Sequence, residues 1–210
     1  MAWTYEQKFN DLNTADLNGQ DSWVRGNTNH EVLVVEDSSY EGTKCIRHNN
    51  ASKGGYYYRA ITAVTDGTFY FAMKRESKVS MTSNINLRNS SNAGRGPIRM
   101  GADGYISYYN GDTGAYVNIL EYDVNQWYVI AVEFDTDYGT YGRYRCKVHN
   151  GTSWSDWGDY VDLHHTNTGD IAYISIDADF SGYATWWDTI TPTDPTVVPV
   201  SRRGGFMAFF

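Results

Sequence analysis

Hydrophobic and polar residues alternate with a period of two along most of the chain, and no stretch longer than two turns has the 3.6-residue period of an amphipathic helix. In the clearest run, residues 125–135, aromatic and aliphatic side chains fall on both faces, which predicts a central strand. The predicted strands are 31–35, 43–48, 56–64, 68–75, 84–88, 98–101, 105–109, 115–122, 127–135, 141–149, 159–163, 171–177 and 185–190. This pattern predicts an antiparallel sandwich or barrel.

The segments between these strands are rich in glycine, asparagine and aspartate. Four dipeptides are typical of hairpin turns, because both central residues of a type I′ turn need positive φ. They are Asp66-Gly67, Asp103-Gly104, Asn110-Gly111 and Asn150-Gly151. The aromatic content of 16%, with 18 tyrosines and 7 tryptophans, suits short pleated strands with half-buried faces.

The charge and the termini limit the possible partners. A formal net charge of −8 argues against nucleic acid, which needs a basic face. No stretch approaches the roughly 18 apolar residues of a membrane helix, and no basic region followed by an apolar run begins the chain, so we expect no signal peptide. Cys45 and Cys146 both lie in predicted strands. They could pair if those strands are adjacent, but free buried thiols are favoured in a reducing cytosol.

Three segments resemble one known family. Residues 125–135 read Asn-x-Trp-Tyr-x-Ile-x-Val-x-Phe-Asp, residues 144–151 follow as Tyr-x-x-Lys-Val-x-Asn-Gly, and residues 187–190 close with Trp-Asp-x-Ile. The chain is similar in these motifs to the concanavalin-A-like, laminin-G-like jelly rolls of lectins and glucanases. The resemblance implies an all-β fold, a two-sheet antiparallel jelly-roll β-sandwich over residues 1–191, with an extended C-terminal tail over residues 192–210. Such a fold hosts many unrelated sites and specifies no function by itself.

The enzymes that the resemblance suggests need residues that this sequence does not place in their patterns. Retaining glucanases of this family carry two glutamates in Glu-x-Asp-x-Glu, and here Asn125 replaces the second, after Glu121 and Asp123. Polysaccharide lyases of similar fold would need a tyrosine and histidine pair with an arginine and a glutamine, and the family's spacing is absent. The five histidines show no metal-ligand pattern, and the His164-His165 pair is interpreted as loop. The sequence thus predicts a protein that is not an enzyme.

The acidic segment that connects the last two predicted strands is a candidate structural calcium site. Asp177, Asp179 and Ser181 provide oxygens at positions 1, 3 and 5, Gly182 stands at position 6, and Asp188 falls at position 12 of a calcium loop. No helices flank it, so it is not an EF-hand. The alternative is an acidic hairpin turn that leads into the last strand.

A turn-rich aromatic stretch is a candidate carbohydrate-binding site. Trp154, Trp157 and Tyr160 lie beside short polar residues, and exposed aromatic rings provide flat faces on which sugar rings stack. The alternative is that these rings pack into the core or its rim.

The C-terminal tail is a candidate docking segment for another protein. Pro192, Pro195 and Pro199 predict an extended spacer. The docking residues predicted to follow it are Arg202, Arg203, Phe206, Met207, Phe209 and Phe210. The alternative is that this apolar end folds back onto its own sandwich.

Together these features favour a non-catalytic structural protein of a phage or virus-like particle, present in several copies and located on the virion surface or outside the cell after release. It would join a capsid or tail protein through its C-terminal tail and could bind surface glycans. The alternatives are a bacterial carbohydrate-binding adhesin or lectin domain and, third, a glycoside hydrolase or polysaccharide lyase.

Overall fold

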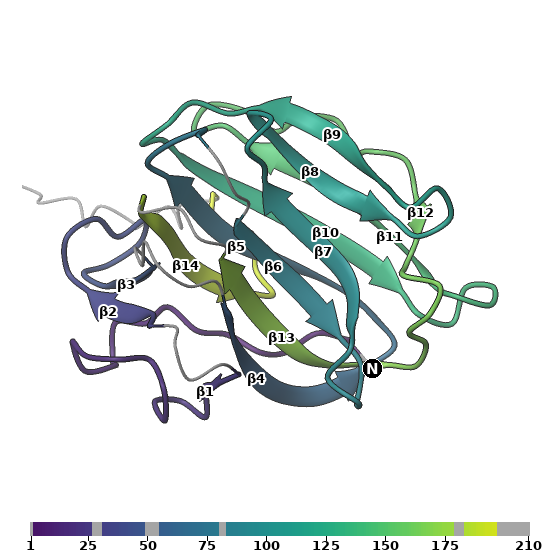
Figure 1. Ribbon diagram of the computed structural model, residues 1–210, viewed down its shortest axis with the longest axis horizontal. Helices are drawn as coiled ribbons and strands as arrows, with labels where there is room; N and C mark the ends of the chain where they lie inside the picture. Colours follow the sequence, from purple (N-terminus) through teal and green to yellow (C-terminus); the bar gives the residue numbers. More distant parts are fainter. Residues whose placement is uncertain (1, 27–30, 49–54, 80–82, 179–182, 197–210) are drawn as a thin grey trace, which may run out of the picture.

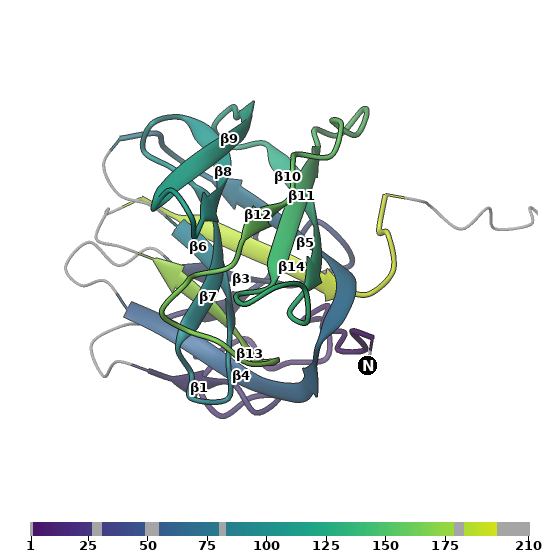
Figure 2. The ribbon, with the colours of Figure 1, turned by 90° about the vertical axis from the view of Figure 1, so that its right-hand side faces the viewer.

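The computed structural model describes residues 2–26, 31–48, 55–79, 83–178 and 183–196. The described residues form two seven-stranded sheets that pack face to face, with no helix among them (Figures 1 and 2). The paired strands among the described residues all run antiparallel. The predicted two-sheet jelly-roll sandwich is therefore confirmed.

The first sheet is the layer nearer the viewer in Figure 1. In spatial order its strands are β1 (Val24–Arg25), β4 (Gly55–Val64), β13 (Ile171–Ala178), β6 (Ser83–Arg88), β7 (Gly94–Met100), β8 (Tyr105–Asn110) and β9 (Ala115–Glu121). The second sheet consists of β12 (Val161–Asp162), β11 (Arg143–His149), β10 (Trp127–Asp135), β5 (Asp66–Arg75), β14 (Thr185–Thr191), β3 (Cys45–His48) and β2 (Leu33–Val35).

The core lies between the sheets and is built by alternate residues of each strand. On β10, Tyr128, Ile130, Val132 and Phe134 are buried in the main hydrophobic cluster, as the period-two pattern predicts. Each such side chain contributes about 1.5–3 kcal/mol when fully buried. The inner residues thus hold the two sheets together and leave the outer residues of each strand available for other roles.

The glycine-containing turns are confirmed at two hairpins and corrected at one position. Asp103-Gly104 joins β7 to β8 and Asn110-Gly111 joins β8 to β9, and both strand pairs are hydrogen-bonded. Asp66-Gly67 is not a hairpin turn, because β4 pairs with β13 in the first sheet whereas β5 pairs with β10 and β14 in the second. The chain crosses between the sheets there.

Both cysteines are buried and unpaired. Cys146 faces the main core from β11, whereas Cys45 lies in a smaller cluster with Val35 and Trp186. Burial raises the pKa of the Cys146 thiol, so it is a structural residue rather than a reactive one. No helix in the described parts of the chain is long and apolar enough to cross a membrane.

Candidate functional site

The outer face of the first sheet, the side turned away from the core, is lined by polar and aromatic side chains. Ile85 and Leu87 of β6 point into the core, so Asn84, Asn86 and Arg88 point outward. The same alternation on β13 buries Ile174 and Ile176. It leaves Tyr173, Ser175 and Asp177 on the outer face.

The strand registers align these outward residues in rows across the sheet. One row reads Tyr56, Asp177, Asn84, Arg99, Ser107 and Asn118, across β4, β13, β6, β7, β8 and β9. The next row begins with Tyr58, Ser175, Asn86 and Pro97. Because neighbouring strands lie about 4.8 Å apart, five intervals span roughly 24 Å. A row of this length can contact an extended chain molecule.

Arg88 is held rigidly at the middle of this face. Its Nε donates to Ser175 Oγ at 2.7 Å and its Nη1 donates to the carbonyl oxygen of Asn92 at 2.9 Å. Its guanidinium lies 4.5 Å from the centre of the Tyr56 ring. Its Nη2 lies 3.5 Å from Asp177 Oδ2, which is a weak contact. The guanidinium is therefore oriented without being fully neutralised.

Asp177 is a carboxyl group whose protonation differs from that of a surface aspartate. Burial raises its pKa, and the charge of Arg88 together with the nearby polar side chains of Ser175 and Asn86 opposes that shift. Burial is the larger effect. Asp177 can therefore hold a proton at a higher pH than an ordinary aspartate.

Three oxygens on this face lack hydrogen-bond partners among the described residues. They are the Oδ1 atoms of Asn84, Asn86 and Asp177, and all three are buried. Buried polar atoms in folded proteins nearly always have a partner. A cluster of unsatisfied acceptors on one face is therefore a place where a ligand with hydroxyl or amide donors would be stabilised.

Tyrosines of β4 and β13 lie beside Arg88. The ring centres of Tyr56 and Tyr58 lie 5.9 Å apart, as do those of Tyr58 and Tyr173. Of these residues, Tyr58 lies opposite Ser175 and Tyr173 lies opposite Arg88 in the strand registers. Their rings offer flat apolar surfaces and their hydroxyls can carry protons.

A second arginine repeats this arrangement toward β9. The Arg99 guanidinium lies 3.6 Å from the centre of the Tyr116 ring, and its Nε donates to Ser107 Oγ at 3.0 Å. Its Nη2 donates to Asp103 at 2.8 Å. The outer face thus carries two arginines, each stacked on a tyrosine and bonded to a serine.

The predicted carbohydrate-binding aromatics lie elsewhere, against the outer face of the second sheet. Lys147 Nζ lies 4.5 Å from the ring centre of Trp154 and 4.9 Å from that of Trp157. The Arg145 guanidinium lies 4.8 Å from the Trp157 ring and 4.4 Å from the Tyr160 ring. The three aromatic residues are therefore brought together, and cations of β11 occupy one side of each ring.

Two of these aromatic residues also line a cavity. It has a volume of about 660 Å³ and lies between β9 and the segment 155–161. Trp157 and Tyr160 line one side, with Asn110 and Asn118 on the other. Trp154 does not line it, because its ring packs against Tyr70 and His149. The carbohydrate-binding role of the three remains a prediction.

The structure does not bring the described calcium candidates together. Asp177 lies on the outer face of the first sheet, whereas Asp188 belongs to β14 in the second sheet. Asp188 accepts hydrogen bonds from the backbone amides of Tyr40 and Glu41 at 2.8 and 3.0 Å. Asp179 and Ser181 lie outside the described residues, so calcium binding by this segment stays a prediction.

The tail residues proposed to dock on another protein, Arg202, Arg203, Phe206, Met207, Phe209 and Phe210, also lie outside the described residues. The start of the spacer is described as far as residue 196. There the Thr196 amide donates to Asp194 Oδ1 at 2.9 Å, so this part contains a turn.

The segment similar to the glucanase motif is a strand end followed by a turn. β9 ends at Glu121, and Asn125 has a φ of 62°. The Asn125 amide donates to the carbonyl oxygen of Arg75 at 2.7 Å. Glu121, Asp123 and Asn125 therefore do not line one strand face.

The candidate site residues that the sequence did not indicate are those of the first sheet's outer face. The alternation in residues 84–88, Asn-Ile-Asn-Leu-Arg, and in residues 173–177, Tyr-Ile-Ser-Ile-Asp, is the signal that could have found them. Each segment places polar side chains opposite core residues. That the two segments are neighbours depends on the pairing of β6 with β13, which local pattern does not reveal.

The solved structures that resemble this fold include those of carbohydrate-active proteins. A protein named sialidase matches with a TM-score of 0.62 and 13% identity over 91% of this chain, which spans 18% of that protein. An endo-β-1,4-glucuronan lyase from Trichoderma reesei matches with a TM-score of 0.51 and 14% identity, over 89% of this chain and 93% of the lyase. A Bacillus licheniformis β-glucanase matches with a TM-score of 0.51 and 15% identity, over 90% of this chain and 98% of the glucanase.

No protein-family model matches the chain, and no curated protein matches its sequence. The structural matches confirm the concanavalin-A-like jelly-roll fold. They also overturn the expectation that the chain is not an enzyme, because glucanases and lyases recur among proteins with this fold. The expectation was wrong because it rested on two local sequence patterns, the missing second glutamate and the absent spacing of the lyase residues, and local patterns do not show which residues the sheets bring together. The matches support the carbohydrate-active alternative better than a structural role in a phage-like particle.

Proposed function

We propose that the protein binds an acidic polysaccharide along the outer face of the first sheet and cleaves it by β-elimination. The observation that carries this proposal is the cluster of unsatisfied buried oxygens of Asn84, Asn86 and Asp177 beside the oriented guanidinium of Arg88. Sugar hydroxyls would satisfy these acceptors. The guanidinium is suited to a uronate carboxylate, which it binds through two parallel hydrogen bonds.

Elimination fits this face better than hydrolysis. A hydrolase of this fold would need two carboxyl groups facing the scissile bond. On this face, Asp103 is bonded to Arg99, and Asp177 contacts Arg88. A lyase instead needs a group that neutralises the uronate carboxylate and a group that takes up and donates a proton. The first role suits Arg88, and the second suits the hydroxyls of Tyr58 and Tyr173.

The elimination step follows from these roles. A phenolate on this face removes the proton from the carbon next to the uronate carboxylate, and Arg88 stabilises the negative charge that develops there. The electron pair then forms a carbon–carbon double bond as the glycosidic bond to the leaving sugar breaks. A tyrosine hydroxyl returns a proton to the leaving oxygen. The products are a new chain end and an unsaturated uronate.

The test is incubation of the purified protein with glucuronan, alginate and a neutral β-glucan. We expect the uronate polymers to be shortened, with ultraviolet absorbance from unsaturated ends. Arg88→Ala and Tyr173→Phe should each lower the rate by about 100-fold or more, as loss of a charge-stabilising group does in other enzymes. Arg47→Ala is the control, because Arg47 lies on the other sheet and pairs with Asp37. New reducing ends without ultraviolet absorbance would contradict elimination, and no cleavage of any uronate polymer would contradict the proposal.

A second candidate function, glycan binding at Trp157 and Tyr160, is supported by the 660 Å³ cavity that they line. Trp157→Ala should weaken glycan binding at this site, measured on a glycan array, while Trp3→Ala would change only stability, because Trp3 is buried in the core. Binding that is unaffected by Trp157→Ala would remove this site.

A further inference from the structure

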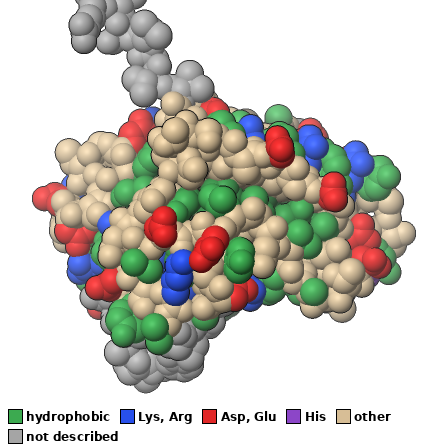
Figure 3. Space-filling view, turned by 90° about the horizontal axis from the view of Figure 1, so that it is seen from above, with side chains coloured by type: hydrophobic (Ala, Val, Ile, Leu, Met, Phe, Trp, Pro, Cys, Tyr) green, Lys and Arg blue, Asp and Glu red, His purple; other side chains and the backbone are tan. Residues whose placement is uncertain are grey.

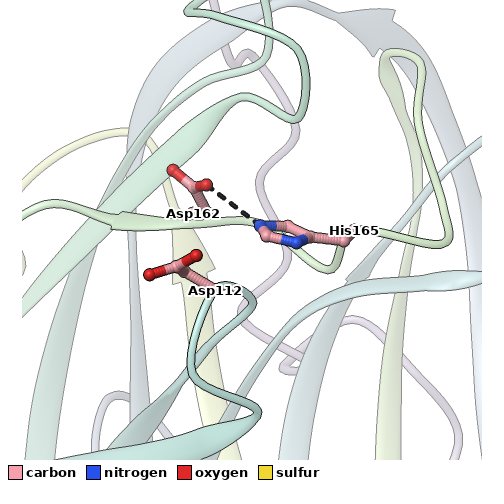
Figure 4. A group of neighbouring side chains, drawn as sticks. All are labelled: Asp112, Asp162 and His165. Atoms are coloured by element: carbon pink, nitrogen blue, oxygen red, sulfur yellow. Dashed lines mark hydrogen bonds and ion pairs between the residues drawn. The ribbon is translucent and has the colours of Figure 1, made fainter.

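The connection after β12 and the turn between β8 and β9 bring three metal-ligating side chains together. They are Asp112, Asp162 and His165, and their ligand atoms all lie within 4.8 Å of one another. Asp162 belongs to β12, Asp112 lies in the β8–β9 turn, and His165 follows β12 by three residues. Figure 4 shows both carboxylates on one side of the His165 ring.

Two of the three ligands are already placed at a suitable separation. His165 Nε2 lies 3.0 Å from Asp162 Oδ2. Ligands bound to one tetrahedral zinc ion at about 2.1 Å are separated by about 3.4 Å. Asp112 is exposed, and its carboxylate lies within 4.8 Å of the other two ligand atoms.

The surrounding contacts hold the ligands in position. The His165 ring stacks on Tyr141, with ring centres 3.9 Å apart and planes inclined by 17°. The Gly111 amide donates to the carbonyl oxygen of Asp162 at 2.8 Å, which fixes the β8–β9 turn against β12. A methyl group at Gly111 would lie 2.0 Å from the carbonyl oxygen of Leu163, so only glycine permits this approach. Such supporting contacts orient ligands before a metal binds.

The charge at this position also favours a cation. In the part of the chain that the structure describes, neither Asp112 nor Asp162 pairs with a lysine or arginine, and the one ion-pair partner of Asp162 is His165 itself. Two carboxylates so close together repel each other unless a positive charge lies between them.

We propose that Asp112, Asp162 and His165 bind one divalent transition-metal ion of the zinc type. An imidazole nitrogen with two carboxylates suits zinc, whereas calcium and magnesium prefer oxygen ligands alone. Three protein ligands leave a position for water. The ion would link the β8–β9 turn to the connection that follows β12. The sequence did not indicate this site, because Asp112 lies far along the chain from the other two ligands.

The test is calorimetric titration of zinc chloride into the full chain, made without a histidine tag and stripped with a chelator. We expect one ion per chain and a rise in melting temperature with zinc. His165→Gln and Asp112→Asn should each weaken zinc binding at least tenfold while the circular dichroism spectrum stays unchanged. The controls are His149→Gln and Asp137→Asn, which alter a half-buried histidine and an exposed aspartate outside the cluster.

Two results would overturn the proposal. One is that His165→Gln and Asp112→Asn bind zinc as tightly as the unaltered chain does. The absence of zinc binding by the unaltered chain counts as the same result. The other is tighter binding of calcium than of zinc. None of these measurements depends on polysaccharide cleavage, so the metal site and the proposed activity are tested separately.

Discussion

Asp188 shows how a single residue can join distant parts of this fold. Its side chain is fully buried, Oδ2 accepts the amides of Tyr40 and Glu41, and Oδ1 accepts the amide of Thr189 at 2.7 Å. The segment before β3 is thereby attached to β14. Burial raises the pKa of Asp188 to about 7, against the lowering effect of these amide donors.

This pKa predicts a pH dependence of stability. The folded state holds the Asp188 proton more tightly than the unfolded state, whose pKa is near 3.8. The resulting contribution is fully present below about pH 4 and is lost as the pH rises to about 7. It amounts to a few kcal/mol at most. Urea unfolding followed by tryptophan fluorescence should therefore show that the stability of the unaltered chain, relative to Asp188→Asn, falls over this range.

The comparison with Asp188→Asn is needed because other groups have the opposite pH dependence. The pKa of Asp21 is lowered by hydrogen bonds from Arg59 and Gln7, which outweigh its burial, so its contribution to stability is lost as the pH falls. The difference between the two proteins removes this common effect. A difference that rises between pH 4 and pH 7 would contradict the assignment to Asp188.

At the scale of elements, a ladder of rings and cations attaches the segment 154–160 to the second sheet. Lys147 lies between Trp154 and Trp157, and two backbone hydrogen bonds support the same segment. Ser155 donates to the carbonyl oxygen of Val148 at 2.8 Å, and Gly158 donates to that of Cys146 at 2.9 Å. The rings are therefore held in place before any ligand arrives.

Removing the central cation should loosen this segment locally. Lys147→Ala removes two cation–π contacts, each worth about 0.5–1 kcal/mol near a surface. Hydrogen exchange at the amides of Ser155 and Gly158 should become faster, while exchange at Ile130 in β10 stays the same. Lys8→Ala is the control, because Lys8 forms surface ion pairs with Glu6 and Glu41 and no cation–π contact with this segment. Unchanged exchange at Ser155 and Gly158 would show that the ladder does not hold the segment.

The sequence predicted elements well where the local pattern was strong. The strand predicted at residues 127–135 has the bounds of β10, because its alternating core residues determine its pairing on both sides. The two-residue strand β1 was missed, and β7 begins at Gly94, four residues before its predicted start. The first four residues of β7, Gly-Arg-Gly-Pro, show no alternation of hydrophobic and polar residues. They form a strand because they pair with β6.

The candidate site was predictable only in part, because it depends on pairing between distant strands. The outward residues of β6 and β13 are visible as local alternation, but the row that joins Asp177 to Asn84 arises from the register between those strands. For the calcium motif at residues 177–188, the local sequence instead suggested a proximity that the fold does not provide. Its spacing looks local, yet Asp177 and Asp188 belong to different sheets.

At the scale of the whole molecule, surface charge is mixed. Basic and acidic side chains are interspersed on the face shown in Figure 3, and the net charge is −8. An acidic polysaccharide would therefore be attracted by oriented arginines at close range rather than by a general positive field. This agrees with the way Arg88 and Arg99 are fixed by stacking and hydrogen bonds.

The last prediction concerns the end of the sandwich and the tail. β14 ends at Thr191, and Gln7 and Ile190 exchange two backbone hydrogen bonds of 2.7 and 2.9 Å, which join the N-terminal segment to the last strand. Residues 193–195 line a small cavity with Glu6, Lys8 and Glu41. The contacts that join the N-terminal segment to the end of the last strand are therefore all made by residues up to 196.

A chain shortened to residues 1–196 should keep the unfolding free energy of the full chain within about 0.5 kcal/mol, as changes away from the core do. The predicted docking of Phe206, Met207, Phe209 and Phe210 on another protein adds a second expectation. The full chain should associate, with itself or with a partner, and the shortened chain should not, because four buried apolar side chains would contribute several kcal/mol to that contact. Urea unfolding and light scattering measure the two effects separately. If the shortened chain is clearly less stable, or aggregates, the tail instead packs on its own sandwich. Its apolar side chains would then cover part of the surface of that sandwich.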